Sequence, residues 1–244
     1  MYRTLTSLVL LALSTPAVAQ DGPYLYVTYF ECDPAEVAAL DAVRTSTVNP
    51  ALDAHVATGS IMAWGWISHH TGGLWSRANY YVAPTLERLM TFHDSWQVQI
   101  AGLSDARAVN QRACPRHVDY IWRQIASSTG REAGNRPATG ASTYFQCGPA
   151  RLGRADEIVR DAFAPILDEL IEEGALSAWR WHGHVMGGAF NRLLVLDGDT
   201  HMANLRAIER FNDRIAERQE RAGTEFSEIC AMHQDYMWNL QGSR

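Results

Sequence analysis

The sequence contains two related halves, in which residue n of the first half matches residue n + 115 of the second. The segment AWGWISHHTGGLWSR at residues 63–77 returns as AWRWHGHVMGGAFNR at residues 178–192. Tryptophan, histidine, a glycine pair and arginine keep the same order and spacing in both segments. Repetition at a fixed offset means that one structural unit is built twice, so the fold is expected to combine two similar units.

The correspondence covers most of the chain. Before residue 80 the matched pairs are Cys32 and Cys147, Pro50 and Pro165, Asp53 and Asp168, Gly59 and Gly174, Trp64 and Trp179, Trp66 and Trp181, His69 and His184, and Arg77 and Arg192. After one inserted residue they are Cys114 and Cys230, His117 and His233, Asp119 and Asp235, Tyr120 and Tyr236, and Trp122 and Trp238. The segment SSTGREAGNRPATGAS between the halves is typical of a linker. We therefore divide the chain into repeat 1 (20–125), a linker (126–140) and repeat 2 (141–244).

The first 19 residues are typical of a secretory signal peptide. Arg3 precedes an apolar run from Leu8 to Leu13, and the small residues Ala17-Val18-Ala19 follow. The run is too short to span a membrane, and no later segment is apolar enough to do so. We therefore expect an exported soluble protein, periplasmic or extracellular, in which the four cysteines form disulfides.

Composition excludes some classes of function. The formal net charge is −6, which argues against general nucleic-acid binding. All 21 basic residues are arginine, so the chain has no lysine that could form a Schiff base. A small molecule is the expected partner, rather than a nucleic acid or a membrane.

Local patterns in repeat 1 predict the order strand, helix, strand, strand, helix, strand. YLYVTYFEC alternates as a strand, and the segment Asp33–Glu36 opens a helix that Gly59 ends, with a kink at Pro50. SIMAWGWISHH and LWSRANYYVA are predicted strands around a tight turn at TGG. Thr85 opens a second helix, LERLMTFHDSWQVQIAG, and RHVDYIWRQ is the last strand. Repeat 2 follows the same order.

This order is that of the split βαβ, ferredoxin-like unit. Two such units in one chain resemble the dimeric α+β barrel superfamily, whose members usually pack two sheets face to face across a dimer. The resemblance implies an α+β fold with two tandem ferredoxin-like units packed sheet to sheet as a pseudo-dimeric barrel, so that a monomer suffices. Trp64 and Trp66 are expected on one face of their strand and Ile61 and Ile67 on the other. Apolar side chains on both faces fit a sheet that is covered on both sides.

The fold implied by this resemblance selects one of the three possible pairings of four cysteines. In a ferredoxin-like sheet the end of the first strand lies beside the start of the fourth. The resemblance therefore implies the disulfides Cys32–Cys114 and Cys147–Cys230. A metal site of four thiolates is the alternative, although the sequence has no closely spaced cysteine pair.

The same topology is expected to gather polar side chains at one end of each sheet. If the hairpin centres on Gly72, His69 faces Trp75 and shares a face with Arg77. A histidine held by a carboxylate can move a proton, and an arginine beside it can hold a carboxylate or enolate oxygen. The candidate catalytic residues are His69, Arg77, His117, Asp119, His184, Arg192, His233 and Asp235. The side chains expected to surround a flat, mostly apolar ligand are Tyr29, Trp66, Trp75, Asn79, Tyr144 and Trp181.

Structural roles compete with these functional ones. His69 and His184 can hydrogen-bond loop carbonyls, and the tryptophans can be core residues. Arg77 and Arg192 can form ion pairs with Asp119 and Asp235. The pairs His69-His70 and His182-x-His184 lack an obvious third ligand, so no metal is assigned. No cofactor is predicted, with haem or a metal ion as the weaker alternative.

The superfamily includes cofactor-free and haem-degrading oxygenases, polyketide cyclases and isomerases. The resemblance therefore implies an exported enzyme of one of these kinds, or a non-catalytic ligand-binding or stress protein of the same fold. Repeat 1 is the more polar half: Asn79 and Tyr81 stand where repeat 2 has Leu194 and Leu196. This difference favours repeat 1 as the working half.

Overall fold

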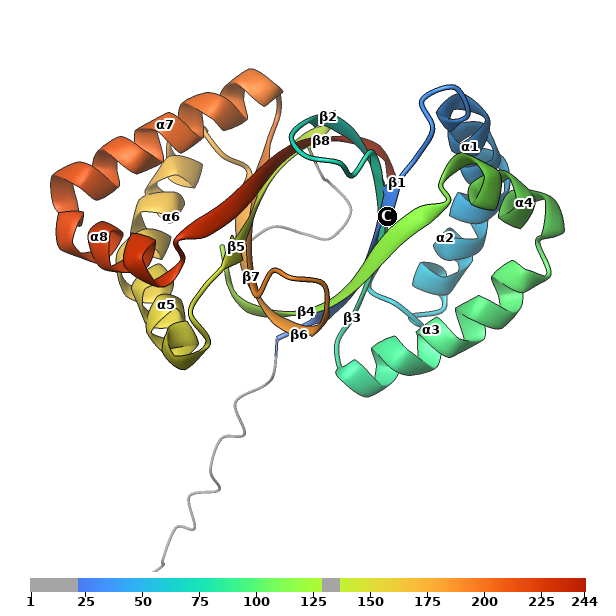
Figure 1. The fold of residues 1–244 in the computed structure, drawn as a ribbon, viewed down its shortest axis with the longest axis horizontal. Coiled ribbons are helices and arrows are strands. Elements are labelled where there is room, and N and C mark those ends of the chain that lie inside the picture. The colour runs from blue at the N-terminus through green and yellow to red at the C-terminus, as the bar shows by residue number, and fades with distance from the viewer. Residues whose placement is uncertain (1–21, 129–136) are drawn as a thin grey trace, which may run out of the picture.

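The structure, a computed structural model, describes residues 22–128 and 137–244. Eight strands close into one barrel in the order β1-β3-β2-β8-β5-β7-β6-β4. Two groups of helices, α1–α4 and α5–α8, cover opposite sides of the barrel (Figure 1). The predicted signal peptide lies outside the described residues. Within them, no helix combines the length and the apolar character needed to cross a bilayer.

The two halves have the same order of elements. The first half contains β1 (Tyr24–Glu31), α1 (Val37–Val43), a π-helical turn (Arg44–Val48), α2 (Asn49–Ala57), β2 (Ala63–Thr71), β3 (Arg77–Ala83), α3 (Leu86–Ala101), α4 (Ser104–Ala113) and β4 (Arg116–Ser127). The second half contains β5 (Thr139–Gln146), a 3₁₀ turn (Pro149–Arg151), α5 (Leu152–Ile158), a π-helical turn (Val159–Phe163), α6 (Ala164–Glu172), β6 (Ala178–Gly187), β7 (Arg192–Gly198), α7 (His201–Arg218), α8 (Glu220–Ile229) and β8 (Met232–Ser243).

The structure refines the predicted elements in three places. A further helix, α4 or α8, precedes the last strand of each half. The expected kink at Pro50 takes the form of a π-helical turn just before it, because a proline ring displaces the carbonyl one turn earlier. The last strand of the first half runs to Ser127 and β5 begins at Thr139, so the connection is shorter than the linker expected at 126–140.

The halves join edge to edge as well as face to face. Strand β2 pairs with β8, and β4 pairs with β6, both antiparallel. Each helix group covers the outer face of its own half of the barrel (Figure 1). The sheet therefore has an enclosed inner face and an outer face buried under helices, as the two apolar faces of strand β2 predict.

Both predicted disulfides are present. Cys32 bonds Cys114, and Cys147 bonds Cys230. Each joins the end of the first strand of a half to the start of its last strand. Each also closes a loop of 82 or 83 residues, for which the chain-entropy model gives on the order of 4 kcal/mol of stabilisation.

Aromatic rings fill the barrel. Those buried inside it are Tyr29, Trp75, Tyr80, Tyr120, Trp122, Tyr144, Tyr236 and Trp238. The free space left among them is about 90 Å³, well below the roughly 300–1,000 Å³ of small-molecule sites. The barrel interior is therefore a packed core, and a ligand site must lie elsewhere.

The repeated glycine pairs allow a hairpin of each half to pack closely against a strand of the other half. The β6–β7 hairpin passes over strand β4 of the other half, and Gly187 (φ +101°) lies against its backbone. The Tyr120 hydroxyl accepts hydrogen bonds from the backbone N–H groups of Ala189 (2.9 Å) and Phe190 (3.3 Å). Gly72 (φ +134°) makes the equivalent contact with β8. A hairpin of each half thus packs against the last strand of the other half.

Candidate functional site

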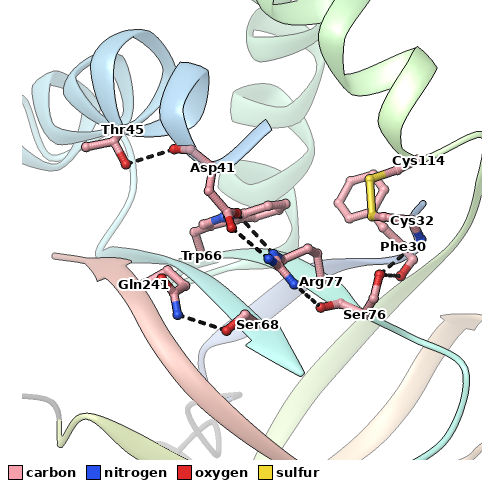
Figure 2. A network of polar contacts seen from close by, with 10 residues as sticks. All are labelled: Phe30, Cys32, Asp41, Thr45, Trp66, Ser68, Ser76, Arg77, Cys114 and Gln241. Carbon is pink, nitrogen blue, oxygen red and sulfur yellow. Dashed lines mark hydrogen bonds and ion pairs between the residues drawn. A yellow bond between two sulfur atoms is a disulfide. The ribbon is translucent and has the colours of Figure 1, made fainter. Parts of the chain in front are cut away.

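The repeated Trp–Arg motif forms a structural network on the outer face of each half. Figure 2 shows the network of the first half. Arg77 donates from Nε and Nη2 to the two carboxylate oxygens of Asp41, at 3.0 and 2.7 Å. Trp66 Nε1 donates to the same carboxylate at 2.8 Å. Asp156 binds Arg192 and Trp181 in the same way in the second half. Arg77 and Arg192 do form ion pairs, but the expected partners Asp119 and Asp235 were wrong.

His69 and Arg77 do not share a face, contrary to the sequence expectation. Ser68 lies directly opposite Arg77, so His69 points the other way, into the barrel. Its ring lies 6.0 Å from Tyr236 and 6.3 Å from Trp238, centroid to centroid. A shift of one residue in hairpin register moves a side chain to the opposite face, which explains the error. Burial lowers the pKa of His69.

His184 occupies the equivalent place inside the barrel. Its ring lies beside Tyr120 and Trp122. Its Nε2 hydrogen-bonds the carbonyl oxygen of Gly187 in the hairpin. The loop-carbonyl role considered from the sequence is therefore the one observed for His184.

Most of the expected aromatic wall is core. Tyr29, Trp75 and Tyr144 are buried inside the barrel. Trp66 and Trp181 are buried between the sheet and the helices. Among the six residues predicted to surround a ligand, Asn79 is the one that lines a large cavity of the first half.

This space, cavity 1, lies between the outer face of the first half-sheet and helices α3 and α4. Its volume is about 700 Å³. Its lining includes His117 and Asp119, whose nearest side-chain atoms, Nε2 and Oδ2, are 3.6 Å apart. His233 and Asp235 lie 3.5 Å apart in the same position of the second half. The structure therefore separates His117 and Asp119 from His69 and places them in a cavity.

A row of side chains crosses the floor of cavity 1. Asp119 pairs with Thr28, Thr28 with Asn79, and Asn79 with Trp66 on successive neighbouring strands. Thr28 Oγ1 donates to Asp119 Oδ1 at 2.7 Å. Two strand spacings separate Asp119 from Asn79, which is about 10 Å between backbones. That span matches a fused two- or three-ring molecule lying along the row.

Arg44 covers the far end of this row from the π-helical turn. Its Nη2 donates to Asn79 Oδ1, and its guanidinium lies 4.2 Å from the centre of the Trp66 ring. It is 6% exposed, and burial lowers its pKa to about 9. Within the described residues its Nε has no hydrogen-bond partner. The nearby carboxylate of Asp41 compensates part of this charge, and the free Nε is a donor that an anionic oxygen of a ligand can accept from.

A second row, next to the first, carries three aromatic side chains that contact one another: Tyr26, Tyr81 and His93. The Tyr81 hydroxyl hydrogen-bonds His93 Nδ1, and the His93 ring stacks on Tyr26 at 4.1 Å between centroids. Burial, together with the hydrogen-bonded carboxylate of Asp119, raises the pKa of Tyr26 to about 12. Burial also raises the pKa of Tyr81 and lowers that of His93. At neutral pH these side chains are therefore uncharged. Tyr81 and His93 line cavity 1 and offer it hydrogen-bonding atoms on aromatic rings.

The lowered pKa of His93 predicts a pH-dependent stability. Below about pH 6.5 the unfolded chain takes up a proton at this histidine more readily than the native protein does, so stability falls as the pH falls. We expect His93→Phe to reduce this loss. Urea unfolding of both proteins at pH 7.5, 6.5 and 5.5 measures it, and NMR titration of the ring gives the native pKa directly. An identical pH slope in the variant would contradict the prediction.

The sequence analysis did not include Arg44, Tyr81 and His93, which line cavity 1, among the candidate site residues, although it noted Tyr81 as a difference between the repeats. The usable signal was the difference between matched positions of the repeats. At n + 115 the second half has Val159 for Arg44, Ala141 for Tyr26, Leu194 for Asn79, Leu196 for Tyr81 and Ile208 for His93. All five of these replacements line the equivalent space in the second half, cavity 2. The polar set is therefore confined to one of two otherwise equivalent cavities.

The residues present do not fit a resident metal or haem well. Within residues 22–128 and 137–244, no three metal-binding side chains converge. Haem iron requires an axial ligand. His93, on α3 in cavity 1, is held by Tyr81 and has one ring face covered by Tyr26. His117 in cavity 1 and His233 in cavity 2 lie beside Asp119 and Asp235, with 53% and 54% of their side chains exposed. We therefore assign no step to either group.

Comparison with known proteins identifies the fold. No family model and no curated protein sequence matches the chain. A candidate monooxygenase of Fusobacterium nucleatum aligns over 92% of this chain and 94% of its own, with 13% identity and a TM-score of 0.62. A candidate monooxygenase of Lactobacillus acidophilus covers 91% and 96% with 5% identity and a TM-score of 0.60. An anthrone oxidase-like protein covers 93% and 94% with 12% identity and a TM-score of 0.56. The chain therefore has the fold of the dimeric α+β barrel superfamily.

Proposed function

We propose that cavity 1 is the active site of a cofactor-independent oxygenase that acts on a flat aromatic molecule with an acidic C–H or O–H group. The observation that carries this proposal is the polar set Arg44, Asn79 and Asp119 on one row of a cavity of about 700 Å³. The second half keeps the cavity and the aspartate but replaces the other two with Val159 and Leu194. A requirement of folding alone would apply to both halves.

Each end of the row has a distinct role in this proposal. Asp119, with His117 beside it, accepts a proton from the substrate. Arg44 and Asn79 hold the oxygen on which the resulting negative charge is delocalised. Phe30, Tyr81 and Trp96 line the same cavity and accept the faces or edges of the rings. This assignment moves the anion-binding role from Arg77, which is held by Asp41, to Arg44.

Dioxygen is the oxidant. An electron-rich carbanion or phenolate can reduce dioxygen itself, which is why no resident cofactor is needed. For a ring CH₂ group, one oxygen atom becomes the new carbonyl and the other leaves as water with the two hydrogens. Cyclases and isomerases of this fold share the proton-abstraction step. The oxygenase is preferred because several proteins of similar structure are candidate monooxygenases or resemble an anthrone oxidase.

Replacing the proposed base should remove turnover without removing binding. With anthrone as the probe substrate, we expect Asp119→Asn to lower the rate of dioxygen consumption by roughly 10²-fold or more. The matched control is Asp235→Asn in the other half, which should leave the rate within about twofold. An oxygen electrode measures the rates, and the near-ultraviolet circular dichroism spectrum reports the fold.

Three outcomes would favour another function. Equal rates for the wild type and Asp119→Asn would remove the proposed base. Saturable anthrone binding with no oxygen uptake by the wild type would favour a ligand-binding protein. A Soret band that saturates at one haem per chain would favour a haem-related role.

We also infer that tandem duplication of a ferredoxin-like unit produced the two repeats, and that the protein is exported. The matched positions and the two equivalent disulfides support both inferences.

A further inference from the structure

We propose that cavity 2 is a second binding site, specific for an uncharged apolar molecule. It lies between the outer face of the second half-sheet and helices α6–α8, and its volume is about 630 Å³. This is within the range of small-molecule sites. The proposal is independent of the reaction proposed for cavity 1.

The wall of cavity 2 has lost the groups that would hold an anion. Val159 replaces the buried cation Arg44, and Leu194 replaces its amide partner Asn79. Ala141 replaces Tyr26, which removes a ring and leaves room along the floor. The remaining wall is formed mainly by apolar side chains of the helices, among them Phe163, Leu167, Ile208 and Phe211. An anion would lose its hydration there without the buried guanidinium that cavity 1 offers, and it would meet the Asp235 carboxylate, whereas an apolar molecule gains by burial.

Ion pairs between helices brace the layer that covers cavity 2. Arg154 binds Glu225 through two hydrogen bonds of 2.8 Å, which joins α5 to α8. Arg214 contacts both Glu169 and Glu173, which joins α7 to α6. Single exposed pairs contribute little, but a network fixes the spacing of helices. The helices are thereby held in place around a space that their side chains do not fill.

The opening of cavity 2 favours neutral molecules too. Asn212, Gly223 and Ser227 line both the cavity and an adjoining outer recess between α7 and α8. The recess also includes Glu220 and Glu228 and no basic residue among its described lining. An anion approaching by this route meets negative charge first, whereas a neutral molecule does not.

Two dyes with the same ring skeleton test the proposal. N-phenyl-1-naphthylamine is neutral, and 1-anilinonaphthalene-8-sulfonate carries a sulfonate; both fluoresce more strongly in apolar surroundings. We expect the neutral dye to bind at one site per chain in cavity 2. Ala141→Phe should weaken this binding at least tenfold by filling the floor, and the matched position of the first half already carries the ring of Tyr26. Ile100→Phe, at a side chain that lines cavity 1 and not cavity 2, should change it less than twofold.

The experiment separates the two cavities. Neutral-dye binding that survives Ala141→Phe in a folded protein, or that is lost in the cavity 1 variant, would overturn the proposal, as would stronger binding of the sulfonate dye in cavity 2. If Ala141→Phe does not fold, Val159→Met fills the same space with a side chain close in length to Arg44. Failure of anthrone oxidation leaves this result untouched, because the dye measures binding in the other half.

Discussion

The double variant Arg44→Val/Asn79→Leu is expected to lose anion binding and at the same time become more stable. It gives cavity 1 the two residues that the second half has at these positions, Val159 and Leu194. The native cation is buried, and its hydrogen bond is to a neutral amide. Removing a buried group of this kind together with its partner is expected to raise the free energy of unfolding by about 1–3 kcal/mol.

The lowered pKa of Arg44 also indicates that its buried charge destabilises the native protein. Burial lowers it from 12.5 to about 9, so between these values the unfolded chain binds a proton that the native protein does not. Stability therefore rises with pH across that window, and below pH 9 the cost of the buried charge is fully present. At pH 7 Arg44 is charged and can bind an anion.

Two measurements check this prediction. Urea unfolding at pH 7 gives the stability, and isothermal titration with 1-anilinonaphthalene-8-sulfonate gives the affinity, which should fall by at least tenfold. Arg192→Leu, at the matched position of the second half, is the control, because Arg192 is bound by Asp156 and its loss should destabilise the protein by about 2–4 kcal/mol without a direct effect on the dye. A destabilised double variant that still binds the anion would show that Arg44 is a structural residue.

Much of the fold could be predicted from the sequence because duplication provides two independent readings of each element. The matched cysteines, strands and glycine pairs are consistent with one topology, and the disulfides Cys32–Cys114 and Cys147–Cys230 are present as expected. The extra helices α4 and α8 were missed. Each has only ten residues and buries little apolar surface, Ala106 and Ala113 in α4 and Phe226 and Ile229 in α8, so neither stands out from the sequence beside the longer helix before it.

The site was harder to predict than the fold. Residues that recur in both repeats, such as Trp66 and Arg77, turned out to hold the helices on the sheet. The proposed binding residue Arg44 comes from a helix and reaches Asn79 only in three dimensions. The side of the sheet to which His69 points depends on the pairing register of the hairpin. The sequence of the turn does not determine that register to within one residue. His117 and Asp119 lie side by side as expected, because residues two apart on a strand share a face, and their role in a site stays a prediction.

Gly187→Ala is expected to destabilise the whole molecule by about 3–5 kcal/mol, although the change adds one methyl group. Gly187 has φ +101°, where an alanine is strained. A Cβ atom there would lie 1.9 Å from the carbonyl oxygen of Asp119 and 3.0 Å from the Cα of Tyr120. Both are backbone atoms of a paired strand, so the β6–β7 hairpin must lift and weaken the hydrogen bonds that the Tyr120 hydroxyl accepts.

The same substitution should lower turnover in cavity 1, because the strand that Gly187 contacts is the one that carries Asp119. A hairpin of the second half thus positions the proposed base in the first half, and neither half is expected to work without the other. Gly153→Ala is the control: a Cβ there meets nothing within 4 Å, and alanine in a helix is worth up to about 1 kcal/mol over glycine. Thermal unfolding and oxygen uptake measure both variants. Unchanged stability in Gly187→Ala would mean that the hairpin does not clasp the opposite strand.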